Sequence, residues 1–547
     1  MPRLAFGRAL ATRCAAVVLC ISMATATAQA DESPAAPPTA VTVTAAASAP
    51  SAPAAPTVAR ATARLKPSAT VTDRVAWSGT GGVDVGRPLP TDPDHLAPSH
   101  VIEHRLRIGG RLAWQGLAGW LPELAADIQV DVLSAPLWRD RDEPLLAADP
   151  LAGRPADVTA GSSQRIRKAS LTATTRYAQI SAGRTVSQWG LGLLAHDGEA
   201  DPWQFGLSRD GHVVDRVALL TMPFAIGHEG DPRDAFPLVV ALAWDWLVRD
   251  DLAIRADGDR GNNAVAALLY HGKQLQLGAY GLWRKQRDRD DLGLDVRGGD
   301  LFAQLSHDHG DWKLLAAAEF ALLRGETGWF RSVSSPDHLD IAQAGGVVRL
   351  QAERGAFGLR LEGGMASGDA NPYDGTVGNF SFARDYRVGL VLFGEVLRRT
   401  SAVSASNLND PRFAGTPPAG WQQLASGGAV NQALYVHPVV RWQPLEGLSF
   451  KAGLLWARSP VDLVDPFLAT TAGGVAVGPR GAAAARDLGL ELDMGASWHH
   501  KLGAGLAIRA AVDAGWWSPG AAFDNADGKS AAAVAAAVAQ IALEGTW

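Results

Sequence analysis

Hydrophobic and polar residues alternate along most of this chain, in short segments separated by Gly, Asp and Pro clusters. Between Glu103 and Trp114, for example, one set of alternate positions holds Leu106, Ile108, Leu112 and Trp114, and the other holds Arg105, Arg107 and Arg111. Successive side chains of a β-strand point to opposite faces. Such a segment therefore predicts a strand with one apolar and one charged face. In a barrel that spans lipid, the apolar face lies outside and the charged face lines the lumen.

The alternation persists over five or six positions in many segments, which suits the roughly 9 to 11 residues that a tilted strand needs to cross a bilayer. The pattern predicts strands at residues 75–86, 102–114, 124–133, 165–174, 176–184, 212–222, 238–249, 263–271, 274–284, 299–306, 311–323, 340–352, 356–366, 385–397, 431–443, 447–458, 487–499, 504–517 and 534–547. Bacterial single-chain barrels have an even number of strands. We therefore expect an all-β, transmembrane, antiparallel up-and-down β-barrel of about 18 strands, with 16 as the alternative and one segment serving as a plug or loop strand.

The last segment carries the most specific signal. Apolar residues occupy every second position from Ala537 to the terminal Trp547. This ending resembles the C-terminal strand by which outer-membrane proteins are recognised by the barrel assembly machinery. A closed barrel also needs its final strand to pair with its first.

Tryptophans lie at or near the ends of the predicted strands, where an interfacial girdle of aromatic rings belongs. The residues assigned to this membrane interface are Trp114, Trp246, Trp312, Trp442, Trp456, Trp516 and Trp547.

The N-terminus has the pattern of a secretory signal peptide. Arg3, Arg8 and Arg13 precede or flank a short apolar run, and Ala28-Gln29-Ala30 forms a small-residue cleavage site. We expect a signal peptide at residues 1–30, a disordered Ala/Pro-rich periplasmic linker at 31–70 and the barrel at 71–547. Both cysteines, Cys14 and Cys20, fall in the signal peptide, which excludes disulfides and thiolate chemistry from the mature chain.

The amino-acid composition and net charge limit the classes of partner that this protein is expected to bind. The formal net charge is −6, and removal of the three signal-peptide arginines makes it more negative, which argues against nucleic acid. The mean hydropathy of +0.00 is lower than a helical membrane protein would show, because alternating strands average out. The expected partners are outer-membrane lipid and lipopolysaccharide, the barrel assembly machinery and components of a periplasmic polysaccharide export system. The expected location is the outer membrane.

The predicted inner face is rich in arginine with interspersed carboxylates. An arginine ladder can pass anions while binding each only briefly; the alternative is that arginines and acids pair to satisfy a polar interior. The predicted lumen-facing residues are Arg105, Arg107, Arg111, Asp127, Gln129, Asp131, Lys313, Glu319, Arg349, Arg360, Glu362, Arg441, Arg509 and Asp513.

Long irregular stretches fit extracellular loops, of which one or more could fold inward as a constriction. They are residues 133–164, 187–210, 369–383, 400–432 and 459–487. The oxygen-rich segment Gly368 to Gly375 does not have EF-hand spacing, and turn chemistry explains it. Gly190 to Gly192 opens no predicted helix, so it predicts no nucleotide site. The sequence shows no paired nucleophile and base, so we expect no enzyme, no cofactor and no metal.

The stretch from Leu361 to Asp369, continuing through Asn371-Pro372-Tyr373-Asp374-Gly375, resembles the strand-plus-loop element of alginate-export-type barrels. Ala182-Gly183-Arg184 followed by Trp189-Gly190 is similar to the Gly-Arg element of the same group. This resemblance implies an 18-stranded monomeric pore with an arginine-lined channel for export of an anionic polysaccharide. The alternatives are a general or nutrient-uptake porin and a plugged barrel acting as a surface adhesin or scaffold. A polymer exporter should have a wide basic channel and a removable plug, whereas an uptake porin should have a constriction made by a loop.

Overall fold

The computed structural model describes residues 64–87, 93–118, 120–140, 165–207, 211–227, 236–329, 338–372, 374–414 and 424–547. The predicted signal peptide and most of the predicted linker lie outside these residues. Within the described part, no helix combines the length and the hydropathy that a membrane span requires.

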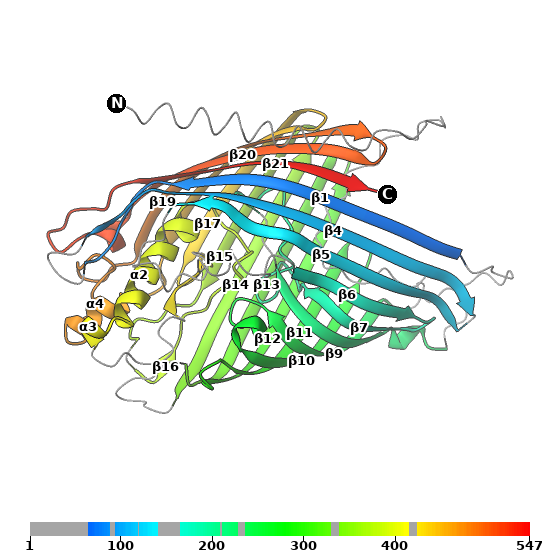
Figure 1. The fold of residues 1–547 in the computed structure, drawn as a ribbon, viewed down its shortest axis with the longest axis horizontal. Helices are drawn as coiled ribbons and strands as arrows, with labels where there is room; N and C mark the ends of the chain where they lie inside the picture. The colour runs from blue at the N-terminus through cyan, green and yellow to red at the C-terminus, as the bar shows by residue number, and fades with distance from the viewer. Residues whose placement is uncertain are drawn as a thin grey trace. The chain divides into compact units, whose positions relative to one another are not determined.

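The alternating segments form one closed antiparallel β-barrel, as predicted (Figure 1). Its sheet has 19 strands, of which the two-residue β16 (Thr376–Val377) pairs in parallel with β14 alone, so 18 strands make up the wall. Each wall strand pairs with its neighbours in sequence, and β21 pairs with β1 to close the ring. The wall strands are β1 (Arg64–Thr80), β4 (Ser99–Ala118), β5 (Leu121–Arg139), β6 (Arg165–Thr174), β7 (Ala178–Ser187), β8 (His212–Thr221), β9 (Leu238–Arg249), β10 (Arg260–His271), β11 (Leu275–Arg287), β12 (Gly293–His309), β13 (Trp312–Thr327), β14 (Leu339–Arg354), β15 (Phe357–Ala366), β17 (Leu434–Leu445), β18 (Leu448–Arg458), β19 (Asp487–Gly503), β20 (Leu506–Ser518) and β21 (Val534–Thr546).

The strands bury one face and expose the other. In β13, Phe320 and Leu322 are exposed, whereas Glu319 and Ala321 between them are buried. In β4, Ile108 and Leu112 are exposed, while Arg107 is buried. The outer wall is therefore apolar and the inner wall carries the charged side chains, an arrangement that suits hydrocarbon outside and polar contacts inside.

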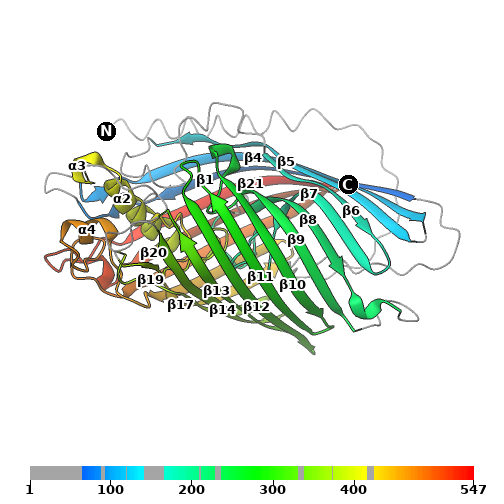
Figure 2. The ribbon, with the colours of Figure 1, turned by 90° about the horizontal axis from the view of Figure 1, so that it is seen from below.

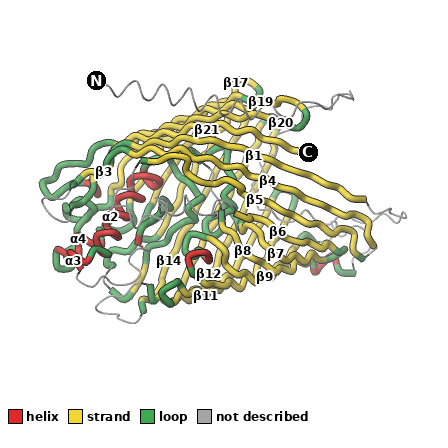
Figure 3. The backbone as a smooth tube through the Cα atoms, in the orientation of Figure 1, coloured by secondary structure: helices red, strands yellow, loops and turns green. Residues whose placement is uncertain are grey.

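The two ends of the barrel differ. At the end that holds the C-terminus, most strands are joined by tight turns, and glycines with positive φ such as Gly355 and Gly447 supply the backbone conformation that such hairpins need. Long loops and the α-helices gather at the opposite end (Figures 1, 2 and 3). The helical elements are η3 (Pro223–Ala225), η5 (Arg255–Asp257), the π-helix η6 (Leu392–Leu397), α2 (Arg398–Leu408), α3 (Pro411–Ala414), α4 (Pro466–Thr471) and η8 (Ala521–Phe523), and a two-stranded sheet joins β2 (Val83–Asp84) to β3 (His95–Leu96).

The barrel begins earlier than the sequence predicted. Strand β1 starts at Arg64, so residues 64–70 belong to the wall and not to the linker, and the first predicted strand at 75–86 is placed too far along. Pro67 obscured this start, because proline is unusual inside strands. It is accommodated because this part of β1 pairs with β4 but lies beyond the first β21 pair, Thr70 with Thr546.

Two other boundaries differ from the predictions. Residues 385–397 form no strand, and their end is the π-helix η6, so this segment is the one of nineteen that belongs to a loop. Its apolar residues pack against the barrel interior, which gave it a strand-like composition. Strand β5 continues to Arg139, so the loop predicted from residue 133 starts later.

Candidate functional site: the constriction inside the barrel

The loop between β7 and β8, residues 188–211 with 208–210 outside the described part, is called here the constriction loop. It makes polar contacts with inward side chains of seven wall strands, β4, β6, β12, β13, β15, β18 and β20. A loop that reaches strands so far apart around the ring lies inside the barrel. The expectation that a long loop folds inward as a constriction is confirmed.

The start of the constriction loop wraps around a wall carboxylate. The backbone N–H groups of Leu191, Gly192 and Leu193 all donate to the Glu319 carboxylate, the last two at 3.1 and 3.2 Å. Gly190 has φ of 51° and a Cβ there would lie 2.6 Å from a Glu319 oxygen, so the position requires glycine. Consecutive N–H groups that converge in this way form an anion-binding nest. The glycine-rich stretch thus binds an anion that the protein itself supplies.

Glu199, further along the constriction loop, meets two wall arginines. Its Oε1 lies 3.0 Å from Arg107 Nη1 and 3.1 Å from Arg167 Nη1. Arg107 also pairs with the buried Asp131 at 2.7 Å. Burial would raise the pKa of Glu199, but the charges of Arg107 and Arg167 outweigh it and lower that pKa. Glu199 is therefore ionised at neutral pH.

Asp201 forms the second charged cluster, on the wall formed by β14 and β15. Its carboxylate lies 2.6 Å from Arg360 Nη1 and 3.9 Å from Arg349 Nη1, and it accepts the N–H of Trp203 at 2.9 Å. The Arg360 guanidinium also lies 5.0 Å from the Trp203 ring centroid. Burial favours the neutral acid, but the charges of Arg360 and Arg349 lower the pKa of Asp201 to about 2.

The far part of the constriction loop reaches β18 and β20. Lys451 donates to the carbonyl of Gln204 and pairs with Asp513 at 3.2 Å. Asp513 in turn accepts the N–H of Gly206 at 2.9 Å. Both wall residues are therefore satisfied by the backbone of the loop.

The connection between β15 and β17, residues 367–433 with 373 and 415–423 outside the described part, also enters the barrel and is called here the second inward loop. Wall residue Glu491 accepts the N–H groups of Leu390, Val391 and Leu392 at 2.5, 2.7 and 2.7 Å. Gly389, just before them, has φ of 68°, and a Cβ there would lie 2.7 Å from Glu491 Oε1. The arrangement at Glu319 on β13 is thus repeated at Glu491 on β19.

A buried aromatic cluster surrounds part of the second inward loop, which also binds Asp251 through Arg384. Phe380, Phe382, Tyr386 and Phe393 belong to one buried cluster that also contains Tyr435 of the wall. The two inward loops are joined directly, since the N–H of Gly211 donates to Asp385 at 3.0 Å. Together they form one body inside the barrel near the long-loop end.

A cavity of about 140 Å³ lies between the constriction loop and strands β8 to β12. Trp189, Arg216, Tyr280 and Phe302 contribute to its lining. The Trp189 and Tyr280 rings lie 4.9 Å apart, and Trp189 Nε1 donates to Asp300 at 2.7 Å, which fixes the indole. The cavity therefore combines aromatic walls with one guanidinium.

Several predicted lumen residues meet in these clusters. Arg107, Asp131, Glu319, Arg349, Arg360 and Asp513 contact the constriction loop or its partners as described, Glu362 binds Arg349 at 2.8 Å, and Gln129 accepts from Arg167 at 2.9 Å. Others lie nearer the short-turn end. Arg111 pairs with Asp127 and Glu123, Arg509 pairs with Glu544, and the exposed Lys313 stands opposite Asp308 and Glu353. Arg105 is buried, and Arg441 lies 6.0 Å from the Trp203 ring.

Sequence reasoning missed Arg167, Glu199 and Asp201 as members of the site. Arg167 lies where the pairing of β5 and β6 shifts register after Gln129, which breaks the alternation used to find inward residues. Glu199 and Asp201 lie in irregular sequence, where no periodicity marks a direction.

Asp369, in the oxygen-rich segment that begins at Gly368, stabilises a backbone turn, as the sequence predicted. Asp369 accepts the N–H groups of Asn371 at 3.0 Å and Gly378 at 3.1 Å. Its carboxylate therefore closes the backbone turn.

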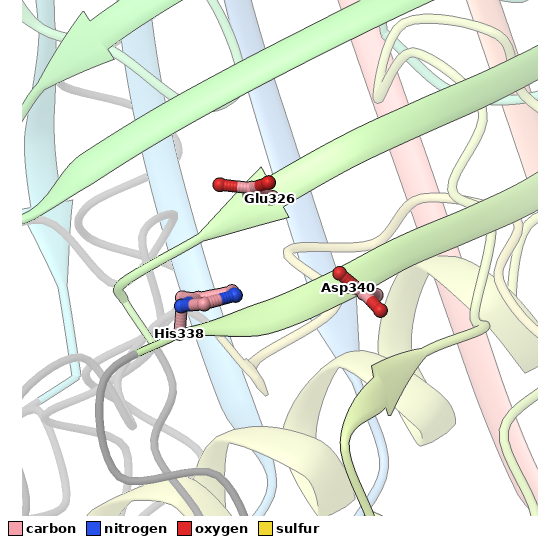
Figure 4. A group of neighbouring side chains, drawn as sticks. All are labelled: Glu326, His338 and Asp340. Carbon is pink, nitrogen blue, oxygen red and sulfur yellow. The ribbon is translucent and has the colours of Figure 1, made fainter.

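Most of the predicted girdle tryptophans are exposed, with Trp114 half-buried. Outside the lumen, Glu326, His338 and Asp340 place ligand atoms within 4.8 Å of one another and are exposed (Figure 4). The loop that separates Glu326 from His338 in the sequence hid this cluster, for which no metal role was predicted.

Comparisons with known proteins give structural neighbours but no sequence family. No family model matches the chain, and no curated protein matches its sequence. The chain is similar to the outer membrane protein OpdK of Pseudomonas aeruginosa, with 10% identity, coverage of 88% of this chain and 99% of the other, and a TM-score of 0.46. For Acinetobacter baumannii OccAB1 the identity is 10%, the coverage 88% and 96%, and the TM-score 0.48. For P. aeruginosa OccK2 (OpdF) these values are 12%, 88% and 98%, and 0.45.

Proposed function

We propose that this chain is an outer-membrane pore for small polar solutes, with the constriction loop as its selective element. The apolar outer wall suits a bilayer, and long loops at one end with tight turns at the other match the outward and periplasmic ends of bacterial barrels. The anchoring of the constriction loop to wall strands all around the ring carries the proposal. An eyelet made in this way is typical of an uptake pore.

The polysaccharide export that the resemblance implied receives less support. An exporter needs a plug that moves aside, and the constriction loop is held by the buried Glu319 and Arg360 and by the half-buried Lys451. Passage of a stiff polymer would break all of these contacts at once. Each broken contact would leave a polar group without a partner, which costs free energy. We therefore favour uptake of small solutes over polymer export.

Conductance and solute permeation test the proposal. We expect refolded protein in a planar bilayer to give a stable conductance, and proteoliposomes to swell with monosaccharides and uronic acids but not with alginate oligomers. Absence of conductance would overturn the pore and favour a plugged scaffold. Swelling with long oligomers would overturn the preference for uptake.

The double variant E199Q/D201N tests whether the constriction loop sets selectivity. Neutralising both acids uncovers the charges of Arg107, Arg167 and Arg360 inside the lumen, so we expect the reversal potential in a salt gradient to shift toward anions. The exposed Arg354, on the outer wall, supplies the control variant R354Q, which should leave the potential unchanged. An unchanged potential in E199Q/D201N would place the selective element elsewhere.

A further inference from the structure

A patch of charged side chains interrupts the apolar outer wall at the long-loop end of strands β11 to β14. In the row next to the apolar band, Trp283, Arg297 and Arg324 stand side by side in the strand register. The next row outward holds Lys285, Asp295, Glu326 and Asp340. Toward the middle of the barrel the outer wall becomes apolar, with Leu322 in the next row and Leu301 and Phe320 in the row after it, all of them exposed. The patch therefore lies where the headgroups of the outer leaflet would meet the wall.

The two arginines of this patch face each other, and neither forms an ion pair with the nearby carboxylates among the described residues. Arg297 and Arg324 are directly opposite in the β12–β13 register, and both are exposed. Like charges directly opposite on neighbouring strands are destabilising. Among the described residues, neither guanidinium has an ion pair, although Asp295 and Glu326 are two positions away along the strands. Asp295 is engaged elsewhere, because it accepts from Trp283 Nε1 at 2.9 Å and pairs with Lys285 at 3.1 Å.

Trp283 orients one of these arginines. The Arg297 guanidinium lies 5.7 Å from the Trp283 ring centroid, and the ammonium of Lys285 lies 4.9 Å from the same ring. An indole at the edge of the apolar band belongs at the membrane interface. The ring therefore holds a cation at the depth where lipid headgroups begin.

We propose that Arg297 and Arg324 bind a phosphate group of the lipopolysaccharide headgroup in the outer leaflet. Guanidinium groups bind phosphate oxygens through two parallel N–H donors. A phosphate between the guanidinium groups of Arg297 and Arg324 would offset the repulsion between their positive charges. The apolar residues below them would contact the acyl chains of the same lipid. This inference rests on the outer-membrane location in the proposed function and is independent of what passes through the lumen.

The carboxylate row next to the arginines affects the design of the test. Glu326, His338 and Asp340 could attract a divalent cation that carries phosphate with it (Figure 4). EDTA present throughout removes this route, so that retention of the lipid depends on the arginines.

The experiment compares R297Q/R324Q with R354Q in refolded full-length protein. Arg354 is a matched control, because it is an exposed arginine of the outer wall that lies 5.4 Å from the ring centroid of Trp312 at the short-turn end. Native mass spectrometry in detergent would count bound diphosphoryl lipid A and the same lipid without its phosphates. We expect the parent and R354Q to retain the phosphorylated lipid, and R297Q/R324Q to bind it at least tenfold more weakly.

The phosphate-free lipid should bind all three proteins as weakly as the phosphorylated lipid binds R297Q/R324Q. Equal retention of phosphorylated lipid by R297Q/R324Q and the parent would overturn the proposal, as would equal retention of the two lipids by the parent. Migration of unheated samples in gels shows that each variant is folded. The conductance of R297Q/R324Q should equal that of the parent, which separates this site from the pore.

Discussion

The two inward loops use the same anchor in different surroundings. Glu319 and Glu491 each accept three consecutive backbone N–H groups, and each approaches a glycine with positive φ. Both loops contribute to one buried cluster, the constriction loop through Trp203 and Phe205, but only the constriction loop places carboxylates, Glu199 and Asp201, on wall arginines. The difference suggests a division of labour, in which the second loop provides a rigid support and the first presents charges to the lumen.

The largest expected effect comes from removing the anchors themselves. Glu491→Ala would leave three buried N–H groups without an acceptor, so we expect a loss of about 3 to 5 kcal/mol in local stability. Glu319→Ala should cost less, because the remaining ion pairs of Glu199 and Asp201 still hold the constriction loop. Hydrogen exchange of residues 390–392 and 191–193 measures both losses. Equal losses would contradict the proposed division of labour.

Protonation next distinguishes the constriction loop from the contact between α2 of the second inward loop and α4, which lies in the connection between β18 and β19. Asp465, at the start of α4, accepts from Ser404 of α2 at 2.8 Å and from the N–H of Leu468 at 2.9 Å. Burial raises the pKa of Asp465 to about 6. Between pH 4 and 6 the folded protein holds a proton that the unfolded chain has lost, so the contribution of Asp465 to stability falls as the pH rises through this window. The total change is about 3 kcal/mol.

The contribution of Asp201 to stability depends on pH with the opposite sign, because the pKa of Asp201, about 2, lies below the ordinary value. Its contribution is fully present above about pH 4 and is lost only as the pH falls toward 2. Hydrogen exchange should therefore show α2 and α4 loosening between pH 4 and 6 while the constriction loop stays unchanged. Asp465→Asn should abolish this dependence, and a parallel response of both loops would contradict the assignment.

The smallest expected effect concerns the glycines. Gly190→Ala and Gly389→Ala place a Cβ against a carboxylate and force a non-glycine residue to positive φ, which costs about 1 to 2 kcal/mol. Because Glu199 and Asp201 of the constriction loop are the proposed selective charges, G190A should also change the single-channel conductance, whereas G389A should leave it closer to that of the parent. Equal conductance changes would show that the second loop also determines the lumen.

The sequence predicted the wall well, because the direction of each side chain in a barrel strand follows from the local alternation of apolar and polar residues. It could not predict the interior. Glu319 and Gly190 are far apart in the chain, and only the closed barrel brings them together. The segment 385–397 was assigned to a strand because a buried π-helix and a lipid-facing strand are both rich in apolar residues. The register shift beside Arg167 likewise leaves no trace in composition.

The seam between β1 and β21 has a kinetic consequence. Ala69 and Trp547 exchange both of their backbone hydrogen bonds, so the ring is closed by the two ends of the described chain. Contacts of such high sequence separation form slowly, since the loop-closure entropy is lost before they stabilise the fold. Until the ring closes, β1 and β21 are edge strands with unpaired N–H and C=O groups. These groups can pair with strands of other chains, which leads to aggregation. Shielding β1 while the rest of the sheet grows towards it should therefore speed the folding of this protein and reduce its aggregation.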